Sequence, residues 1–249
     1  RDYTPTKPAE GAKRVGLPRM LFVHEMLPFF KTFLAEMGFE VVLSDYTTKN
    51  IIHDGVEAVA SESCFPVKVA HGHVIDLINK GVDAVFMPSA ISLEKQNALT
   101  DKSFTCPYVQ TSPYVISAAL DLETKEMPVL VPKLFFERGD AALVNALHDS
   151  LKPLGVKKGD VRRAFKAAQS AQNEFYARIK TRGIEVLEGL DKDDNAVVII
   201  GRPYNTCDGG INLEMPKKFR DLGTLAIPMD FLPVEEVELS HEWDNMYWK

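Results

Sequence analysis

Apolar residues along the first half of the chain alternate between short continuous runs and runs with helical spacing. Continuous apolar runs at 14–18, 39–43 and 83–88 are typical of parallel strands that are covered on both faces. Between them, apolar residues recur every three or four positions at 25–37 and 50–59, which predicts two helices. This alternation of strand and helix has the period of a doubly wound α/β unit.

A further helix is predicted from Pro66 to about Gly81. Proline suits the first helical position, because an N–H there would have no partner within the helix. Ser61 and Ser63 are both candidate caps for this helix. Cys64 then lies at the positive end of the helix, where a negative charge is stabilised.

Lys68 and His71 follow Cys64 at helical spacing and share its side of the predicted helix. The helix end and these two basic side chains each favour a thiolate, which is a metal ligand or a nucleophile. Alternatively, Cys64 is a small buried apolar residue, as most free cysteines are. His73 lies two positions after His71, so only one of the two histidines can face a site with Cys64.

Residues 89–105 are polar and have no clear period, which predicts a long loop. Cys106 follows this loop and precedes Pro107, which favours extended backbone at the cysteine and a short strand after it. Open α/β sheets bind ligands at loops outside the carboxyl ends of their strands. Because Cys64 and Cys106 both lie in such loops, we expect the two thiols to converge. Two unrelated thiols are the alternative.

The second half of the chain begins with a predicted strand at 128–132. Helical patterns follow at 140–151 and 160–190, and the longer helix carries a largely continuous apolar stripe. A buried strand is predicted at 197–203. We interpret the long helix as a bridge between two α/β units.

The strand at 197–203 repeats the start of the chain at an offset of 185 residues. In each copy two glycines lie 22 residues apart around an apolar-periodic helix, and an aspartate follows 7 residues after the second glycine. The fixed positions are Gly16, Gly38 and Asp45 in the first copy and Gly201, Gly223 and Asp230 in the second. We infer an internal duplication, although chance matching of two α/β units would give the same pattern.

The expected fold is therefore α/β, with two similar Rossmann-like (doubly wound) units joined by a helical segment, the second unit being incomplete. The expected organisation is a tail or linker at 1–12, a first Rossmann-like domain containing Cys64 and Cys106 at 13–128, a mainly helical bridge at 129–193 and the start of a second, truncated α/β domain at 194–249.

The loop that opens the second copy, 201–212, is far more polar than its counterpart. Arg202 is suited to clamp a phosphate or carboxylate, and Asn205 and Asp208 supply orienting hydrogen bonds. Cys207 lies at the same kind of strand-end turn as the other two cysteines. An ordinary Asx turn with a helix cap is the alternative. We favour a functional loop because loops commonly carry function.

The composition and the absence of several motifs argue against some classes of function. A net charge of −6 and the lack of a Lys/Arg cluster argue against a nucleic-acid surface. No apolar run approaches the ~20 residues needed to span a bilayer. Three scattered cysteines make no disulfide framework, which favours a reducing, cytoplasmic environment. Walker-type, Gly-x-Gly-x-x-Gly and Cys-x-x-Cys motifs are absent, so nucleotide hydrolysis, NAD and ferredoxin-type sites are not indicated.

Five runs of the sequence resemble one specific domain: 16–19 (GLPR), 40–45 (EVVLSD), 63–68 (SCFPVK), 70–74 (AHGHV) and 201–205 (GRPYN). This is the uncharacterised domain of the large acyl-CoA dehydratase activase-related proteins, which is similar to the iron–sulfur component of 2-hydroxyacyl-CoA dehydratases. The resemblance covers about residues 13–249.

The resemblance implies a [4Fe–4S] or double-cubane cluster held by cysteines in an interdomain cleft. Electrons would come from an ATP-hydrolysing activase domain or protein, and an acyl-CoA would be the substrate. Cys64 and Cys106 match the first two cysteine positions of the family and would be metal ligands, with Cys207 a candidate third. Nearby polar residues would support the cluster or face the substrate: Lys68, His71, Arg202, Asn205 and Asp208.

The function that the resemblance implies is an iron–sulfur electron-transfer module of a 2-hydroxyacyl-CoA dehydratase-like system. The alternative is a cluster-free docking or regulatory module between activase and catalytic domains. A weaker third hypothesis is a small-molecule binder that uses the cleft alone. Iron content, and whether Cys64 and Cys106 approach each other, separate the first two.

Overall fold

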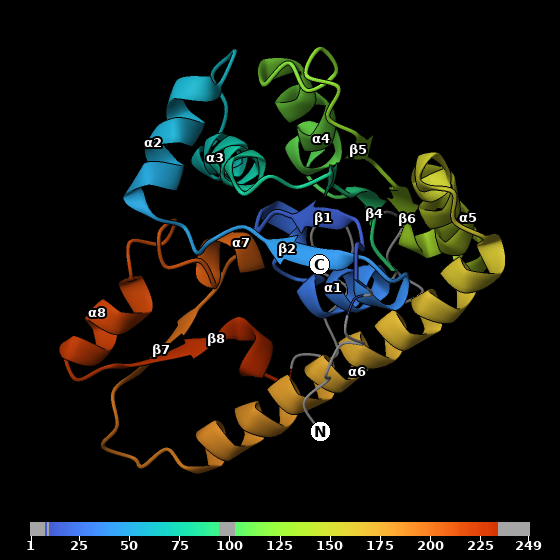
Figure 1. Cartoon of the computed structure of the whole chain (residues 1–249). Coiled ribbons are helices and arrows are strands. Elements are labelled where there is room, and N and C mark those ends of the chain that lie inside the picture. The colour runs from blue at the N-terminus through green and yellow to red at the C-terminus, as the bar shows by residue number, and fades with distance from the viewer. Residues whose placement is uncertain (1–7, 9, 95–102, 234–249) are drawn as a thin grey trace.

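The computed structural model describes residues 8, 10–94 and 103–233. Its centre is a four-stranded parallel sheet in the order β2-β1-β3-β5 (Figure 1). The strands are β1 (Arg14–Leu17), β2 (Glu40–Leu43), β3 (Ala84–Phe86) and β5 (Val129–Leu130). The first three match the apolar runs of the sequence, and β5 joins this sheet although it begins just beyond the expected domain boundary at 128.

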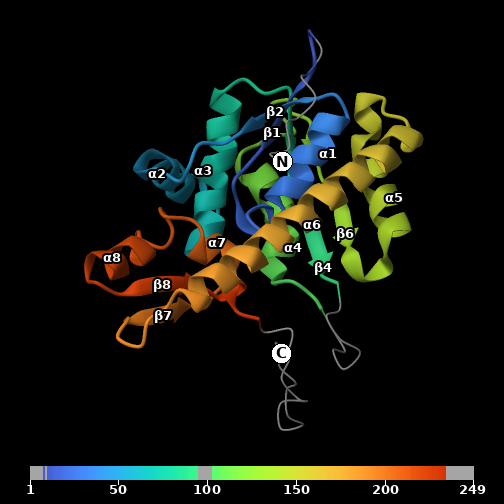
Figure 2. The same cartoon turned by 90° about the horizontal axis from the view of Figure 1, so that it is seen from below.

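Helices cover both faces of this sheet, as the continuous apolar runs required. The helix α1 (Leu27–Glu36) lies on one face, and α2 (Lys49–Ala58), α3 (Phe65–Asn79) and α4 (Pro107–Ala119) lie on the other (Figures 1 and 2). A short 3₁₀ turn, η1 (Leu21–Val23), links β1 to α1. The core between the layers is rich in fully buried side chains, among them Phe30, Phe33, Leu77 and Phe86.

The segment predicted as a loop at 89–105 contains a strand. There β4 (Ser89–Ser92) pairs in parallel with β6 (Lys133–Phe135) as a small second sheet. The spacing of apolar residues does not predict this strand, because two of its buried residues are serines, which count as polar. Ser89 is fully buried, and its hydroxyl donates to the carbonyl of Gln110 at 2.7 Å.

The bridge between the two halves is helical. After η2 (Phe136–Arg138), α5 (Asp140–Leu151) and η3 (Lys152–Leu154), the long helix α6 (Lys158–Glu188) packs across α1 and extends beyond the first sheet (Figure 2). Both predicted helices of this region are therefore confirmed. The apolar stripe of α6 is buried only in its first half, at positions such as Val161 and Phe165.

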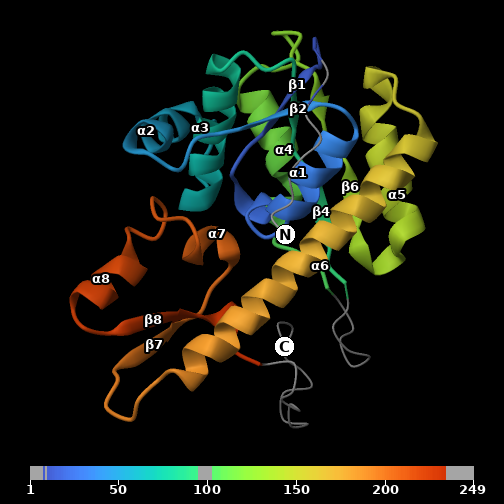
Figure 3. The ribbon, with the colours of Figure 1, turned by 60° about the horizontal axis from the view of Figure 1, so that its bottom comes forward.

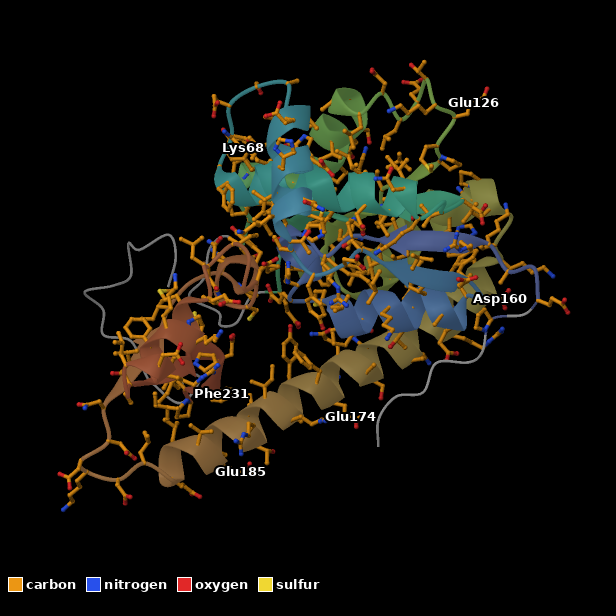
Figure 4. All side chains as sticks on the ribbon, turned by 60° about the vertical axis from the view of Figure 1, so that its left-hand side comes forward. Lys68, Glu126, Asp160, Glu174, Glu185 and Phe231 are labelled. Atoms are coloured by element: carbon orange, nitrogen blue, oxygen red, sulfur yellow. The ribbon has the colours of Figure 1, made fainter. Side chains whose placement is uncertain are left out.

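The second unit sits at the far end of α6. It contains β7 (Ala196–Ile199), α7 (Pro203–Thr206), α8 (Met215–Asp221), β8 (Leu225–Pro228) and η4 (Met229–Phe231), and β7 pairs in parallel with β8 (Figure 3). Figure 4 shows Phe231 beside the stretch of α6 between Glu174 and Glu185. A glycine permits this contact, because a Cβ at Gly183 would lie 2.5 Å from the carbonyl oxygen of Phe231.

The proposed duplication is matched in part by the strands. Both copies form a parallel strand pair around a helix, and β2 and β8 occupy equivalent positions at the expected offset. The first strands are out of step, because Gly16 lies within β1 whereas Gly201 follows the end of β7. The architecture is thus α/β with parallel sheets, and the descent of both units from one Rossmann-like ancestor stays a prediction.

Candidate functional site

Two helices begin immediately after a cysteine. Cys64 is the N-cap of α3, and Cys106 is the N-cap of α4, both in extended backbone with ψ of 150° and 135°. The short strand predicted after Cys106 is therefore wrong. Pro107 supplies the first residue of a helix, a position where proline removes no helical hydrogen bond.

The structure also corrects the predicted caps of α3. Neither Ser61 nor Ser63 is the cap, and neither cysteine side chain makes a capping hydrogen bond. The sulfur atoms of Cys64 and Cys106 therefore remain available at the ends of two helices where backbone N–H groups point outward. Such ends favour a negatively charged group, including a metal-bound thiolate.

Tyr204 of α7 lies within electrostatic reach of both thiols. The pKa of its phenol is raised, chiefly by burial and further by Cys106 and Cys64, while Arg202 opposes the shift. The second unit thus places an aromatic hydroxyl and a guanidinium in the same cavity lining as Cys106. The convergence of Cys64 with Cys106 stays a prediction.

A small cavity lies at this junction. Its walls come from η1, the start of α4 and the start of α7, and they include Phe22, Cys106, Arg202 and Tyr204. The cavity volume is about 40 Å³, whereas one water needs roughly 10–15 Å³. The cavity therefore admits a small group or a few waters and is too small to enclose a coenzyme.

Glu25 forms part of the cavity wall. Burial raises the pKa of this carboxyl, Arg202 lowers it and Asp230 raises it further. The charge of Glu25 also contributes, after burial, to raising the pKa of Tyr176 to about 12. Sequence reasoning missed Glu25, because a single carboxylate at a predicted helix start carries no sign of burial.

Lys68 and His71 lie on α3 as predicted, but they have partners of their own. Lys68 Nζ pairs with Glu62 Oε2 at 2.6 Å. His71 is buried, its Nδ1 donates to the carbonyl of Val67 at 2.8 Å, and burial lowers its pKa. Within the described residues, His71 Nε2 and the hydroxyl of Ser63 are buried without a hydrogen-bond partner. The Cys64 helix thus carries unused polar atoms.

The predicted residues of the 201–212 loop lie in different surroundings. Arg202 lines the cavity, whereas Asn205 is exposed. Cys207 is also exposed, with its sulfur 3.6 Å from the hydroxyl of Thr206. Asp208 is buried and accepts a hydrogen bond from Thr47 of the first unit.

A metal needs more ligands than this pair of thiols provides. In the ranges that the structure describes, no group of three or more His, Cys, Asp or Glu side chains is arranged to hold a metal ion. The thiol pair is therefore an incomplete ligand set in this part of the chain. Among the same residues, no helix is both long and apolar enough to cross a membrane.

Comparison with known proteins gives one match. The profile of a family described as the CoA enzyme activase uncharacterised domain matches residues 14–232, from β1 to the residue after η4. Neither the curated proteins nor the solved structures contain a match.

Proposed function

The chain belongs to the CoA enzyme activase uncharacterised domain family, and we propose from this premise that it is an electron-transfer module in which Cys64 and Cys106 ligate an iron–sulfur cluster. The observation that carries the proposal is the placement of both cysteines at the ends of proline-started helices, with one tyrosine within electrostatic reach of both. Its partner would be an ATP-dependent activase domain or protein.

The donor set suits part of such a cluster. Thiolates are the usual ligands of iron–sulfur clusters, and nearby hydrogen bonds and limited solvent tune their potential. Cys64 and Cys106 would supply two thiolates, Cys106 from the cavity wall and Cys64 from the start of α3, so a cluster would need further ligands. A bound cluster would supply one-electron transfer at low potential.

The residues around the thiols have separate roles in this proposal. Tyr204 offers a hydroxyl donor to a thiolate, and Arg202 offsets negative charge at the cavity. His71 holds an unused Nε2 lone pair on the Cys64 helix. An acyl-CoA substrate would bind outside the cavity, because about 40 Å³ cannot enclose it.

Iron and sulfide analysis after anaerobic purification and reconstitution tests this proposal. We expect wild-type protein to hold iron and sulfide with broad visible absorption, and Cys64→Ala and Cys106→Ala each to lose them. Cys207→Ala is the matched control and should retain iron, because Cys207 is exposed like Cys64 but follows the end of α7 instead of preceding a helix. Equal iron content in all four proteins, or none in a folded wild type, would overturn the assignment.

A cluster-free docking module is the second candidate. The described residues contain no closed metal-binding group, and the thiols are flanked by exposed aromatic side chains at Phe65, Phe104 and Tyr108. Aromatic residues of this kind are enriched at protein interfaces. In this case wild-type protein lacks iron, and Tyr108→Ser weakens binding to an ATP-dependent activase domain without changing the unfolding transition.

A further inference from the structure

A chain of hydrogen bonds through His73 of α3 joins the first unit to the second. Ser44 Oγ lies 2.9 Å from His73 Nδ1, and His73 Nε2 lies 3.0 Å from Thr47 Oγ1. Thr47 in turn donates to Asp208 Oδ2. Ser44, His73 and Asp208 are all buried, whereas the two bonds made by Thr47 are partly buried.

The direction of each bond follows from the last one. Because Thr47 gives its hydroxyl proton to Asp208, its oxygen accepts from His73 Nε2–H. His73 Nδ1 is then the acceptor, and Ser44 donates to it, while Ser44 Oγ accepts from the backbone N–H of Arg19 at 2.8 Å. The chain is thus complete only when His73 is neutral. A second proton, on Nδ1, would leave the Ser44 hydroxyl proton without its acceptor.

Asp208 ties this chain to the loop that follows α7. Its Oδ1 accepts from the N–H groups of Gly210 and Ile211 at 2.9 and 3.1 Å. The loop backbone also touches Thr47 directly, because a Cβ at Gly210 would lie 2.5 Å from Thr47 Cγ2. One carboxylate therefore organises the loop and attaches it to the first unit.

The attached loop continues from the segment that closes the cavity. Arg202 and Tyr204 lie only a few residues before Asp208, and both line the cavity beside Cys106. Figure 3 shows α7 between the first unit and the β7–β8 pair. Release of Asp208 would remove this hydrogen-bonded link between the segment and the first unit.

We propose that the Ser44–His73–Thr47–Asp208 chain is a proton-controlled latch, which holds the Arg202–Tyr204 segment over the thiols while His73 is neutral and releases it when His73 is protonated. The proposal of the latch depends on these hydrogen bonds and contacts and not on the proposed function. Only its consequence, control of access to the thiol pair, rests on the proposed function.

The surroundings of His73 favour its neutral form while the latch is closed. Burial lowers the pKa of His73 to about 4; Asp208 and Asp76 raise it, and His24 and Arg19 lower it. Since burial outweighs both carboxylates, His73 binds a proton less readily in the closed site than it would in a site open to water.

His24 strengthens the same conclusion. Its Nε2 lies 3.5 Å from Asp208 Oδ2, buried and without a hydrogen-bond partner among the described residues. Burial lowers the pKa of His24 more than the charge of Asp208 raises it. The closed latch therefore keeps both of its histidines neutral, and acid favours the open state at each of them.

Hydrogen exchange of the full, metal-free chain tests the latch. Protection of residues 203–214 is compared at pH 7 and pH 5 after correction for intrinsic exchange, with α1 as the internal reference. If opening restores an ordinary histidine pKa near 6.5, protection of this segment falls about 20-fold between pH 7 and pH 5. Protection of α1 should stay unchanged, because the opening is local.

Two variants complete the experiment. In His73→Gln the amide can accept from Ser44 and donate to Thr47 but cannot be protonated, so protection of 203–214 should lose most of its pH dependence, with only the contribution of His24 remaining. His53→Gln, on the exposed face of α2, is the matched control and should behave as wild type. Thr47→Val keeps the shape but removes the link, and it should lower protection of 203–214 at both pH values.

Each contrary result overturns the latch: equal wild-type protection at both pH values, undiminished pH dependence in His73→Gln, or loss of α1 protection in parallel. If His73→Gln does not fold, an unchanged 203–214 segment in Thr47→Val still refutes it. Because no metal is present, failure here leaves the thiol proposal intact, and absence of iron leaves the latch intact.

Discussion

Two glycines set the close approach of α2 and α3. A Cβ at Gly72 would overlap the carbonyl oxygen of Ile51, and a Cβ at Gly55 would meet the carbonyl oxygen of Lys68. Both obstacles are backbone atoms, which cannot rotate away. Gly72→Ala should therefore force the helices apart or break the contact.

The magnitude follows from two opposing effects. Overpacking of a close-packed site costs roughly 1–3 kcal/mol, and the high end applies because the two backbones must separate by about 1.5 Å for ordinary contact. The gain in helix propensity from Gly to Ala offsets about 1 kcal/mol. We expect the free energy of unfolding to fall by about 2 kcal/mol.

Urea unfolding followed by far-UV circular dichroism measures this loss. Gly159→Ala is the matched control, because it also lies in a helix but a Cβ there would meet no atom within 4 Å. The control should match or slightly exceed wild type in stability. If Gly72→Ala is as stable as Gly159→Ala, then the described packing of α2 on α3 is incorrect.

Three further predictions use other parts of the molecule. The pKa of His73 in the folded protein, about 4, lies below its ordinary value of about 6.5. The free energy of unfolding is therefore highest above pH 6.5 and falls as the pH falls toward 4. Urea unfolding should give a free energy about 2 kcal/mol lower at pH 5 than at pH 7, and His73→Gln should remove most of that difference. Gln172→Ala should cost roughly 1–3 kcal/mol by the same assay, because it leaves the Phe29 N–H and the Glu25 carbonyl without their partner; an unchanged midpoint would contradict those two bonds. Glu25→Gln should stabilise the protein at pH 7 but not at pH 4, since burial raises the carboxyl pKa and its ionisation above that pKa opposes folding; equal effects at both pH values would argue against the burial of this carboxyl.

Much of the fold could be predicted from the sequence, because the apolar residues that set the helical or strand period are also the residues that the fold buries. The strands at 14–18, 39–43 and 83–88, and the long helix, follow directly from apolar spacing. The same logic fails at Ser89–Ser92, where serine hydroxyls are buried; that of Ser89 donates to the distant carbonyl of Gln110. It also fails after Cys106, because a residue before proline is extended both at a helix cap and in a strand.

The candidate site is only partly readable. The topological rule that loops meet outside the carboxyl ends of parallel strands predicts that Cys64 and Cys106 converge. Nothing in the sequence places Tyr204 beside them, because that contact depends on how the second unit sits against the first. The link from Thr47 to Asp208 spans 161 residues, and no local pattern encodes it.

The structure gives each residue of the run His71-Gly72-His73 a role that its spacing in the sequence alone did not predict. The two histidines serve different surroundings, as helical geometry predicted: His71 bonds to its own helix, and His73 bonds across to Ser44 and Thr47. The glycine between them is required by the neighbouring helix α2. The run thus combines three separate constraints on one turn of α3.

The continuity of α6 has a mechanical consequence. Its 31 residues span about 46 Å, with one end fixed against α1 and the other against η4 through Gly183. A tilt of about 5° about its midpoint moves each end by roughly 2 Å, which is enough to break a hydrogen bond. A force applied to the exposed outer half of α6 would therefore be transmitted to η4 and to the second unit that contains it.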